Sequence, residues 1–317
     1  MLSRRLMERF TKDCKIPIKT YKDTNCFLDR LALYDKFYGT LDKWKEFKDI
    51  VSRYPNEEAY FAEYNRVKDN AINFIKDTEG YAVFNTLDMN GFAIKNKQFS
   101  NKDIFHPSNI KRTFISIDMK KANFNSLRYY DSSIFDEAKT WEDFIRKFTD
   151  NEYIVKSKYI REVILGNCNP KRHITYEKYL MDGILTAILE KRTENCIEMR
   201  DDDIVFFSND EIIIDITDMS NDTIRNVEAI VNDVVSHSEL PFTIEKFILR
   251  GIFDNETPVG YIKELSDGSI DFKCVNSITL PFIIRTINNE PITESDRCFE
   301  YEGKLATLIE IPQINIT

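Results

Sequence analysis

The sequence predicts an α+β fold with a helical N-terminal region, a central region of strands and helices, and a strand-rich C-terminal region. Apolar residues recur every three or four positions through residues 25–77, whereas short apolar runs bounded by polar turns follow residue 110 and dominate after residue 240. With 42% hydrophobic residues, 23 Phe and 15 Tyr among 317 residues, the chain can bury a sizeable core. We expect three domains over residues 1–110, 111–240 and 241–317.

The N-terminal domain is expected to be mainly helical. Segments 25–37, 41–54 and 56–77 have helical spacing of their apolar residues. The aromatic residues of the last segment are at a spacing typical of a core, which we favour over a base-stacking surface. Between Gly80 and Phe99 the pattern changes to short extended runs.

The central domain is expected to pair an antiparallel sheet with packed helices. A buried strand over Thr113–Asp118 opens it, and the apolar runs Ile204–Phe207 and Ile212–Ile216 predict a hairpin with a four-residue polar tip. Helices are predicted over residues 120–130, 141–148, 152–165, 176–194 and 222–237. Strands of the C-terminal domain are predicted over residues 242–249, 259–265, 270–275, 279–284 and 305–311.

Charge and cysteine usage exclude several classes of protein. The net charge of −9 is concentrated in residues 201–317, where 8 Lys+Arg stand against 23 Asp+Glu, so coating of nucleic acid by bulk charge is not expected. The near-neutral residues 1–200 leave room for a local basic channel. Six scattered cysteines and three histidines form no zinc pattern. No run of eighteen apolar residues occurs, so we expect a cytoplasmic protein with reduced thiols and no membrane partner.

Two acidic sites stand where apolar strands end. Asp118 closes the strand after residue 112, and Asp210 and Glu211 lie at the tip of the hairpin. A carboxylate at the end of a buried strand is costly unless a charge compensates it, and a divalent cation shared between two strands does so. We therefore predict Asp118 and Asp210 as ligands of Mg²⁺ or Mn²⁺, with Glu211 as an auxiliary catalytic carboxylate. The alternative is that these strand ends simply emerge into water.

The order of these features resembles the palm domain of family B DNA polymerases over residues 111–275. Asp118 in FISIDMKKANFNSL matches the motif A aspartate, and Lys158, eight residues before Gly166, matches the motif B lysine. Asp210 matches the second aspartate of motif C. The run Asn209-Asp210-Glu211 is also similar to the H-D-E motif of family A, which makes that family the second resemblance.

The resemblance implies a role for several further residues. Lys158 would bind the incoming nucleoside triphosphate. Motif A has a tyrosine that excludes ribonucleotides, where this chain has Asn123 followed by Phe124, and both are candidate nucleotide-binding residues. The residues implied to contact nucleic acid near the primer are Lys246 and, less closely matched, Tyr261 and Lys263.

The function that the resemblance implies is a metal-dependent nucleotidyltransferase, a minimal DNA polymerase without a proofreading exonuclease. It would add nucleotides to the 3′ end of a primer or primer-template by a two-metal mechanism. Motif B is degraded, with Glu162, Val163 and Leu165 in place of its Asn, Ser and Tyr. The alternative is therefore a catalytically inactive palm-derived protein that binds nucleic acid or serves in assembly. The Asn-, Ile- and Lys-rich composition is typical of an AT-rich genome and favours a viral source.

Overall fold

An antiparallel sheet organises the fold. The structure, a computed structural model, describes residues 2–99 and 103–317 and places seven of their strands in this sheet, in the order β2-β3-β1-β4-β5-β6, with β9 paired to β4. The strands are β1 (Thr113–Met119), β2 (Ile204–Phe207), β3 (Glu211–Asp215), β4 (Phe242–Asp254), β5 (Thr257–Leu265), β6 (Ile270–Lys273) and β9 (Ile314–Ile316). A separate hairpin joins β7 (Cys298–Tyr301) to β8 (Lys304–Thr307). The predicted α+β class and the strand-rich C-terminal region are confirmed.

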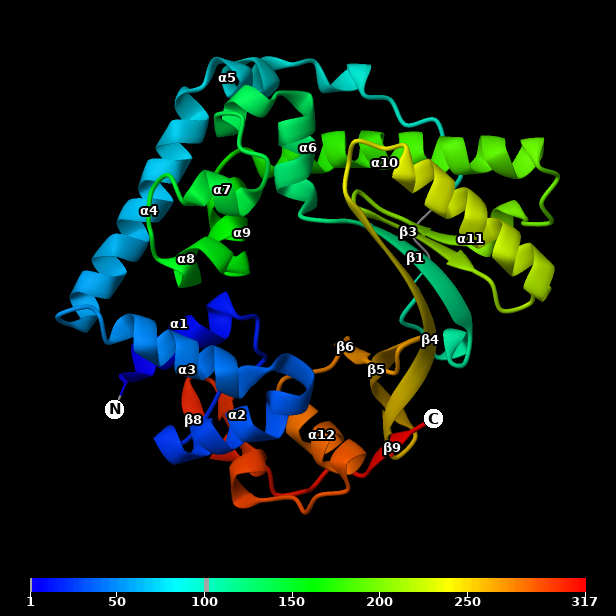
Figure 1. The fold of residues 1–317 in the computed structure, drawn as a ribbon. Helices are drawn as coiled ribbons and strands as arrows, with labels where there is room; N and C mark the ends of the chain where they lie inside the picture. Colours follow the sequence, from blue (N-terminus) through cyan, green and yellow to red (C-terminus); the bar gives the residue numbers. More distant parts are fainter. Residues whose placement is uncertain (1, 100–102) are drawn as a thin grey trace.

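The helices fall into three groups along the chain (Figure 1). Before the sheet come α1 (Arg4–Asp13), α2 (Thr24–Tyr38), α3 (Thr40–Val51), α4 (Glu57–Asp77) and α5 (Glu79–Thr86). Between β1 and β2 come α6 (Ala122–Tyr130), α7 (Trp141–Ile145), α8 (Glu152–Lys156), α9 (Lys158–Gly166) and α10 (Pro170–Glu194). Later come α11 (Asn221–Ser236) and α12 (Leu280–Asn288). Across the described ranges, every helix is too short or too polar to cross a membrane.

The two faces of the sheet have different partners because side chains alternate along each strand. Ile115 and Ile117 of β1 pack with residues of α10 and α11, and Figure 1 shows both helices on that side. Phe114 points to the other face, in a cluster with Ile104, Ile213 and Phe247. Ser116 and Asp118 alternate with Ile115 and Ile117, and so they share the face of Phe114.

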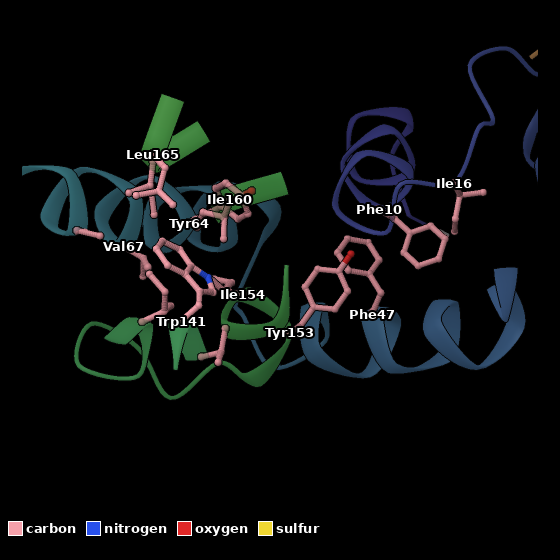
Figure 2. Close-up of a cluster of buried hydrophobic side chains, with 14 of the residues drawn as sticks. Phe10, Ile16, Phe47, Tyr64, Val67, Trp141, Tyr153, Ile154, Ile160 and Leu165 are labelled. Atoms are coloured by element: carbon pink, nitrogen blue, oxygen red, sulfur yellow. The ribbon is translucent and has the colours of Figure 1, made fainter. Parts of the chain in front are cut away.

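One hydrophobic cluster joins the N-terminal helices to the helices that follow β1. Figure 2 shows part of it, with Phe10 and Phe47 beside Tyr153. Leu280 and Ile284 of α12 belong to the same cluster, and α2 contacts α12. The hydrophobic cores therefore cross the boundaries expected at residues 110 and 240.

Some predicted elements were wrong. The segment after Gly80 begins as helix α5, because the Thr78 hydroxyl accepts a hydrogen bond from the Tyr81 N–H and starts a new helix. Residues 279–284, predicted as a strand, begin helix α12, whose first turn contains Pro281. Proline suits that position because the first turn has no use for its missing N–H, and a short apolar run does not by itself distinguish a strand from a buried helix.

Two predicted helices have different bounds. The helix expected over residues 152–165 is two helices, because the Ser157 side chain accepts from the Ile160 N–H and caps α9. Helix α10 begins at Pro170, six residues before the predicted start. The strand expected over 305–311 is limited to β8, which ends at Thr307.

Candidate active site

Asp118 and Asp210 lie on neighbouring segments at one end of the sheet. Asp118 is opposite Glu211 in the β1–β3 register, and the Met119 N–H donates to the Asp210 carbonyl at 2.8 Å. Ser208 orders the hairpin tip, since its hydroxyl donates to Asp210 Oδ1 at 3.1 Å and accepts from the Glu211 N–H at 3.1 Å. The fold thus brings together the two aspartates that the sequence singled out.

The Asp118 carboxylate is crowded by like charge. Burial, followed by the negative charges of Glu211 and Asp210, raises the pKa of Asp118 to about 6. Lys263 acts in the opposite direction but does not cancel these effects. The carboxylate of Glu211 accepts a hydrogen bond from the Ser116 hydroxyl on the same sheet face. A divalent cation would relieve this crowding.

The donor set fits Mg²⁺ or Mn²⁺ supplied together with a phosphate ligand. Among residues 2–99 and 103–317 there is no group of three or more His, Cys, Asp or Glu side chains arranged to hold a metal ion. Mg²⁺ in phosphoryl-transfer sites is usually held by only one or two carboxylates and completes its shell with substrate phosphates and water. Asp118 and Asp210 can supply those two carboxylates.

The two aspartates line a pocket of about 440 Å³. Its other walls come from α6, α9 and the first two turns of α10. The polar side chains lining it, besides the two aspartates, are those of Lys121, Asn123, Lys158, Arg161, Glu162, His173 and Glu177. The pocket therefore unites the predicted motif A, B and C positions, which are up to 92 residues apart in the chain.

Arg161 is a pocket residue that the sequence analysis missed. Its guanidinium is half-buried, and its Nε has no hydrogen-bond partner. Burial lowers the pKa of Arg161, against the opposing charges of Glu162 and Glu142. Lys158 lies three residues earlier on the same face of α9 and is exposed, and neither side chain makes an ion pair with a described residue. The α9 wall thus presents two unpaired cations to the pocket.

Helix α10 contributes two buried titratable groups that were also missed. Glu177 Oε2 accepts from Asn209 Nδ2 at 3.1 Å, next to Asp210. Burial raises the pKa of Glu177 to about 7, with the Asn209 hydrogen bond opposing it and the Asp210 charge adding to it. Burial lowers the pKa of His173 to about 4, slightly opposed by the Cys168 backbone, and neither ring nitrogen has a partner in hydrogen-bond geometry within the described chain. His173 is therefore neutral at pH 7.

Asn123 and Phe124 lie on different sides of α6. Asn123 lines the pocket, whereas the Phe124 ring is buried with its centroid 4.6 Å from that of Phe135 and 5.9 Å from that of Trp141. Phe124 is thus a core residue outside the pocket lining. Of the two candidates for contact with a nucleotide sugar, only Asn123 lines the pocket.

The three residues expected to contact nucleic acid lie on β4 and β5, outside the pocket. Lys263 is buried, pairs with Glu245 and lies 4.6 Å from the Phe247 ring centroid. Tyr261 is buried in the cluster on the Phe114 face. Lys246 is partly exposed, and its Nζ lies 3.0 Å from Glu228. Of these three, only Lys246 offers accessible charge.

Acidic and cationic side chains both line the pocket. Two carboxylates suit a divalent metal, and the guanidinium of Arg161 with the ammonium of Lys158 suits phosphate oxygens, so the arrangement is complementary to a metal-bound polyphosphate. A volume of about 440 Å³ lies within the range of small-molecule sites.

Compared with known proteins, the chain matches no family model and no curated protein.

Proposed function

We propose that the protein is a metal-dependent nucleotidyltransferase, a minimal polymerase that adds nucleotides to the 3′ end of a primer or primer-template. The observation that carries this proposal is that one pocket is lined by Asp118 and Asp210 and also by the cations Lys158 and Arg161. The proposed cofactor is Mg²⁺ or Mn²⁺, and the proposed partners are a nucleoside triphosphate and nucleic acid. The cysteines are free, which suits the reducing cytoplasm as the site of action.

The side chains that line the pocket would have different roles. Asp118 and Asp210 would hold the metal, which when bound activates the attacking hydroxyl and neutralises charge on the leaving pyrophosphate. Arg161 can bind two phosphate oxygens with its planar fork, whereas Lys158 acts as a point charge. Glu177 holds the hairpin tip through Asn209 and so supports the position of Asp210. Asn123 can donate to or accept from a sugar hydroxyl.

A second candidate function is that of an inactive palm-derived protein that binds nucleic acid or serves in assembly. One observation favours it. Glu162, at a motif B position, lines the pocket next to Arg161 and adds a negative charge where a triphosphate would lie. Its ion pair with Lys15 partly neutralises that charge. The two candidates differ in whether nucleotides are incorporated.

A primer-extension assay distinguishes them. The purified protein is incubated with a labelled primer-template, each dNTP or NTP, and Mg²⁺ or Mn²⁺. We expect incorporation that Asp118→Asn and Asp210→Asn abolish, because the amide keeps the shape but loses the charge that holds a metal. Glu300→Gln, an exposed carboxylate on β7, is the matched control and should retain full activity. Nucleic-acid binding without incorporation under any condition would refute the enzyme and establish the second candidate.

A further inference from the structure

Helix α9, which carries Lys158 and Arg161, begins at a buried serine that contacts the N-terminal helix α1. The Ser157 hydroxyl accepts from the Ile160 N–H at 3.2 Å and donates to Asp13 Oδ1 at 3.1 Å. Ser157 is 5% exposed and Asp13 is 4% exposed. One hydroxyl thus has two functions. Its first bond caps α9, and its second ties the start of α9 to the end of α1.

Asp13 is itself held by residues of α1 and α4. Its Oδ1 also accepts from the Tyr64 hydroxyl at 3.0 Å and lies 3.5 Å from Arg9 Nη1. Arg9 donates to the Tyr64 hydroxyl at 3.1 Å, and its guanidinium lies 4.9 Å from the ring centroid of Tyr159 on α9. The other carboxylate oxygen of Asp13, Oδ2, and the Nε of Arg9 are buried without a hydrogen-bond partner among the described residues, so Oδ1 makes all of these contacts. The network therefore joins three helices at one carboxylate oxygen.

Another polar contact of α9 lies further along the helix, where Glu162 pairs with Lys15 at the surface, and the contacts of α9 with α4 are hydrophobic. Figure 2 shows Ile160 and Leu165 of α9 beside Tyr64 and Val67 of α4, in the hydrophobic cluster. Hydrophobic contact is not directional, so it holds α9 against α4 but leaves its position along the axis less defined. The hydrogen bond to Asp13 is directional. It acts one residue before Lys158.

We propose that Asp13 is a positioning residue for the pocket, which fixes the start of α9 through the Ser157 hydroxyl and so sets the positions of Lys158 and Arg161. The identity of the ligand rests on the proposed function, whereas the effect on α9 does not. The proposal gives the N-terminal helical region a role, since α1 and α4 then hold the cationic wall of the pocket.

The test uses full-length variants and two readouts. Hydrogen exchange reports the opening of α9 amides, and calorimetric titration reports the Kd for inorganic tripolyphosphate with Mg²⁺. Asp13→Ala removes the hydrogen bond between Ser157 and residue 13 but leaves the hydrogen bond with which Ser157 caps α9. Asp13→Asn keeps an acceptor oxygen for the Ser157 hydroxyl. Tyr54→Phe is the matched control, because it removes a tyrosine hydrogen bond to another carboxylate, that of Glu63 on α4, outside the Asp13 network.

We expect Asp13→Ala to speed α9 exchange and to raise the Kd, each about tenfold, as loss of a hydrogen bond to a charged group implies. Asp13→Asn should recover most of both values, and Tyr54→Phe should leave both within about twofold of the wild type. If Asp13→Ala does not fold, Asp13→Leu, which also lacks an acceptor oxygen but fills the space, makes the same comparison with Asp13→Asn.

The outcomes separate the two proposals. Unchanged α9 exchange and Kd in folded Asp13→Ala, or an equal effect of Tyr54→Phe on both readouts, would overturn the positioning role. A wild type that binds no tripolyphosphate would instead count against the nucleotide pocket, and the exchange of α9 would still decide the role of Asp13.

Discussion

Replacing Arg161 with methionine should make the protein more stable and its polyphosphate binding weaker. The buried Nε has no partner, and leaving such a group unsatisfied costs ~1–3 kcal/mol. Methionine keeps the apolar stem without the polar atoms, so the free energy of unfolding should rise by about that amount. A hydrogen bond from a charged group contributes ~1.5–3 kcal/mol, which corresponds to a loss of affinity of about ten- to hundredfold.

Urea denaturation measures the first effect, and calorimetric titration with Mg²⁺ and inorganic tripolyphosphate measures the second. Lys156→Met is the control, because Lys156 is an exposed cation near α9 that does not line the pocket. It should change neither quantity appreciably. An Arg161→Met protein that is less stable and binds tripolyphosphate as tightly as the wild type would refute the reasoning, since it would make Arg161 a structural residue.

Three further predictions concern Asp13, Asn123 and Phe124. Burial raises the pKa of Asp13 from 3.8 to about 6, so the folded protein binds this proton more tightly than the unfolded chain. Its stabilisation is complete below about pH 4 and is lost as the pH rises through 6, and at 1.4 kcal/mol per pKa unit it amounts to ~3 kcal/mol. Asp118 and Glu177 add a dependence of the same sign, so Asp13→Asn should reduce the loss of stability between pH 4 and 7 in urea denaturation by about that amount, and an unchanged profile would contradict the assignment. Because Asn123 can form a hydrogen bond with a 2′-hydroxyl, we expect competition kinetics to show a discrimination between rNTP and dNTP of less than about a hundredfold. A preference for dNTP above about a thousandfold would show that another group excludes the hydroxyl. Phe124→Ala should lower the free energy of unfolding by ~3–5 kcal/mol because the ring is buried, and a loss below about 1 kcal/mol in urea denaturation would contradict its place in the core.

The sequence was most informative where the signal is local. Asp118 and Asp210 were found because each lies at the end of an apolar strand, and the hairpin between Ile204 and Asp215 consists of two apolar runs on either side of a polar tip. The α+β class followed from the change from helical spacing to such short apolar runs. Neither inference needed knowledge of how distant segments pack.

His173 and Glu177 were missed because assigning them to the pocket requires the correct bounds of α10 and the face of that helix that lines the pocket. The predicted start of α10 at Tyr176 left His173 outside the helix. With Pro170 in the first turn, His173 and Glu177 lie one turn apart on the side that lines the pocket. Pro170 was the signal that could have found them.

Arg161 and Asp13 were beyond local reasoning for a different reason. A helical arginine is ordinarily solvated, and only the packing of Ile160 and Ile164 into the core determines that Arg161 faces the pocket. The bond between Asp13 and Ser157 joins positions 144 residues apart. No periodic pattern encodes such a contact.

The central claim is that Asp118 and Asp210 hold a metal whose polyphosphate ligand reaches α9. Anomalous diffraction from crystals grown with Mn²⁺ and a non-hydrolysable nucleoside triphosphate tests it directly. The account predicts a manganese peak about 2.1 Å from oxygens of both carboxylates, with the phosphates against Arg161 and Lys158. Manganese and triphosphate bound away from this pocket, or carboxylates of Asp118 and Asp210 more than about 10 Å apart in that complex, would contradict it.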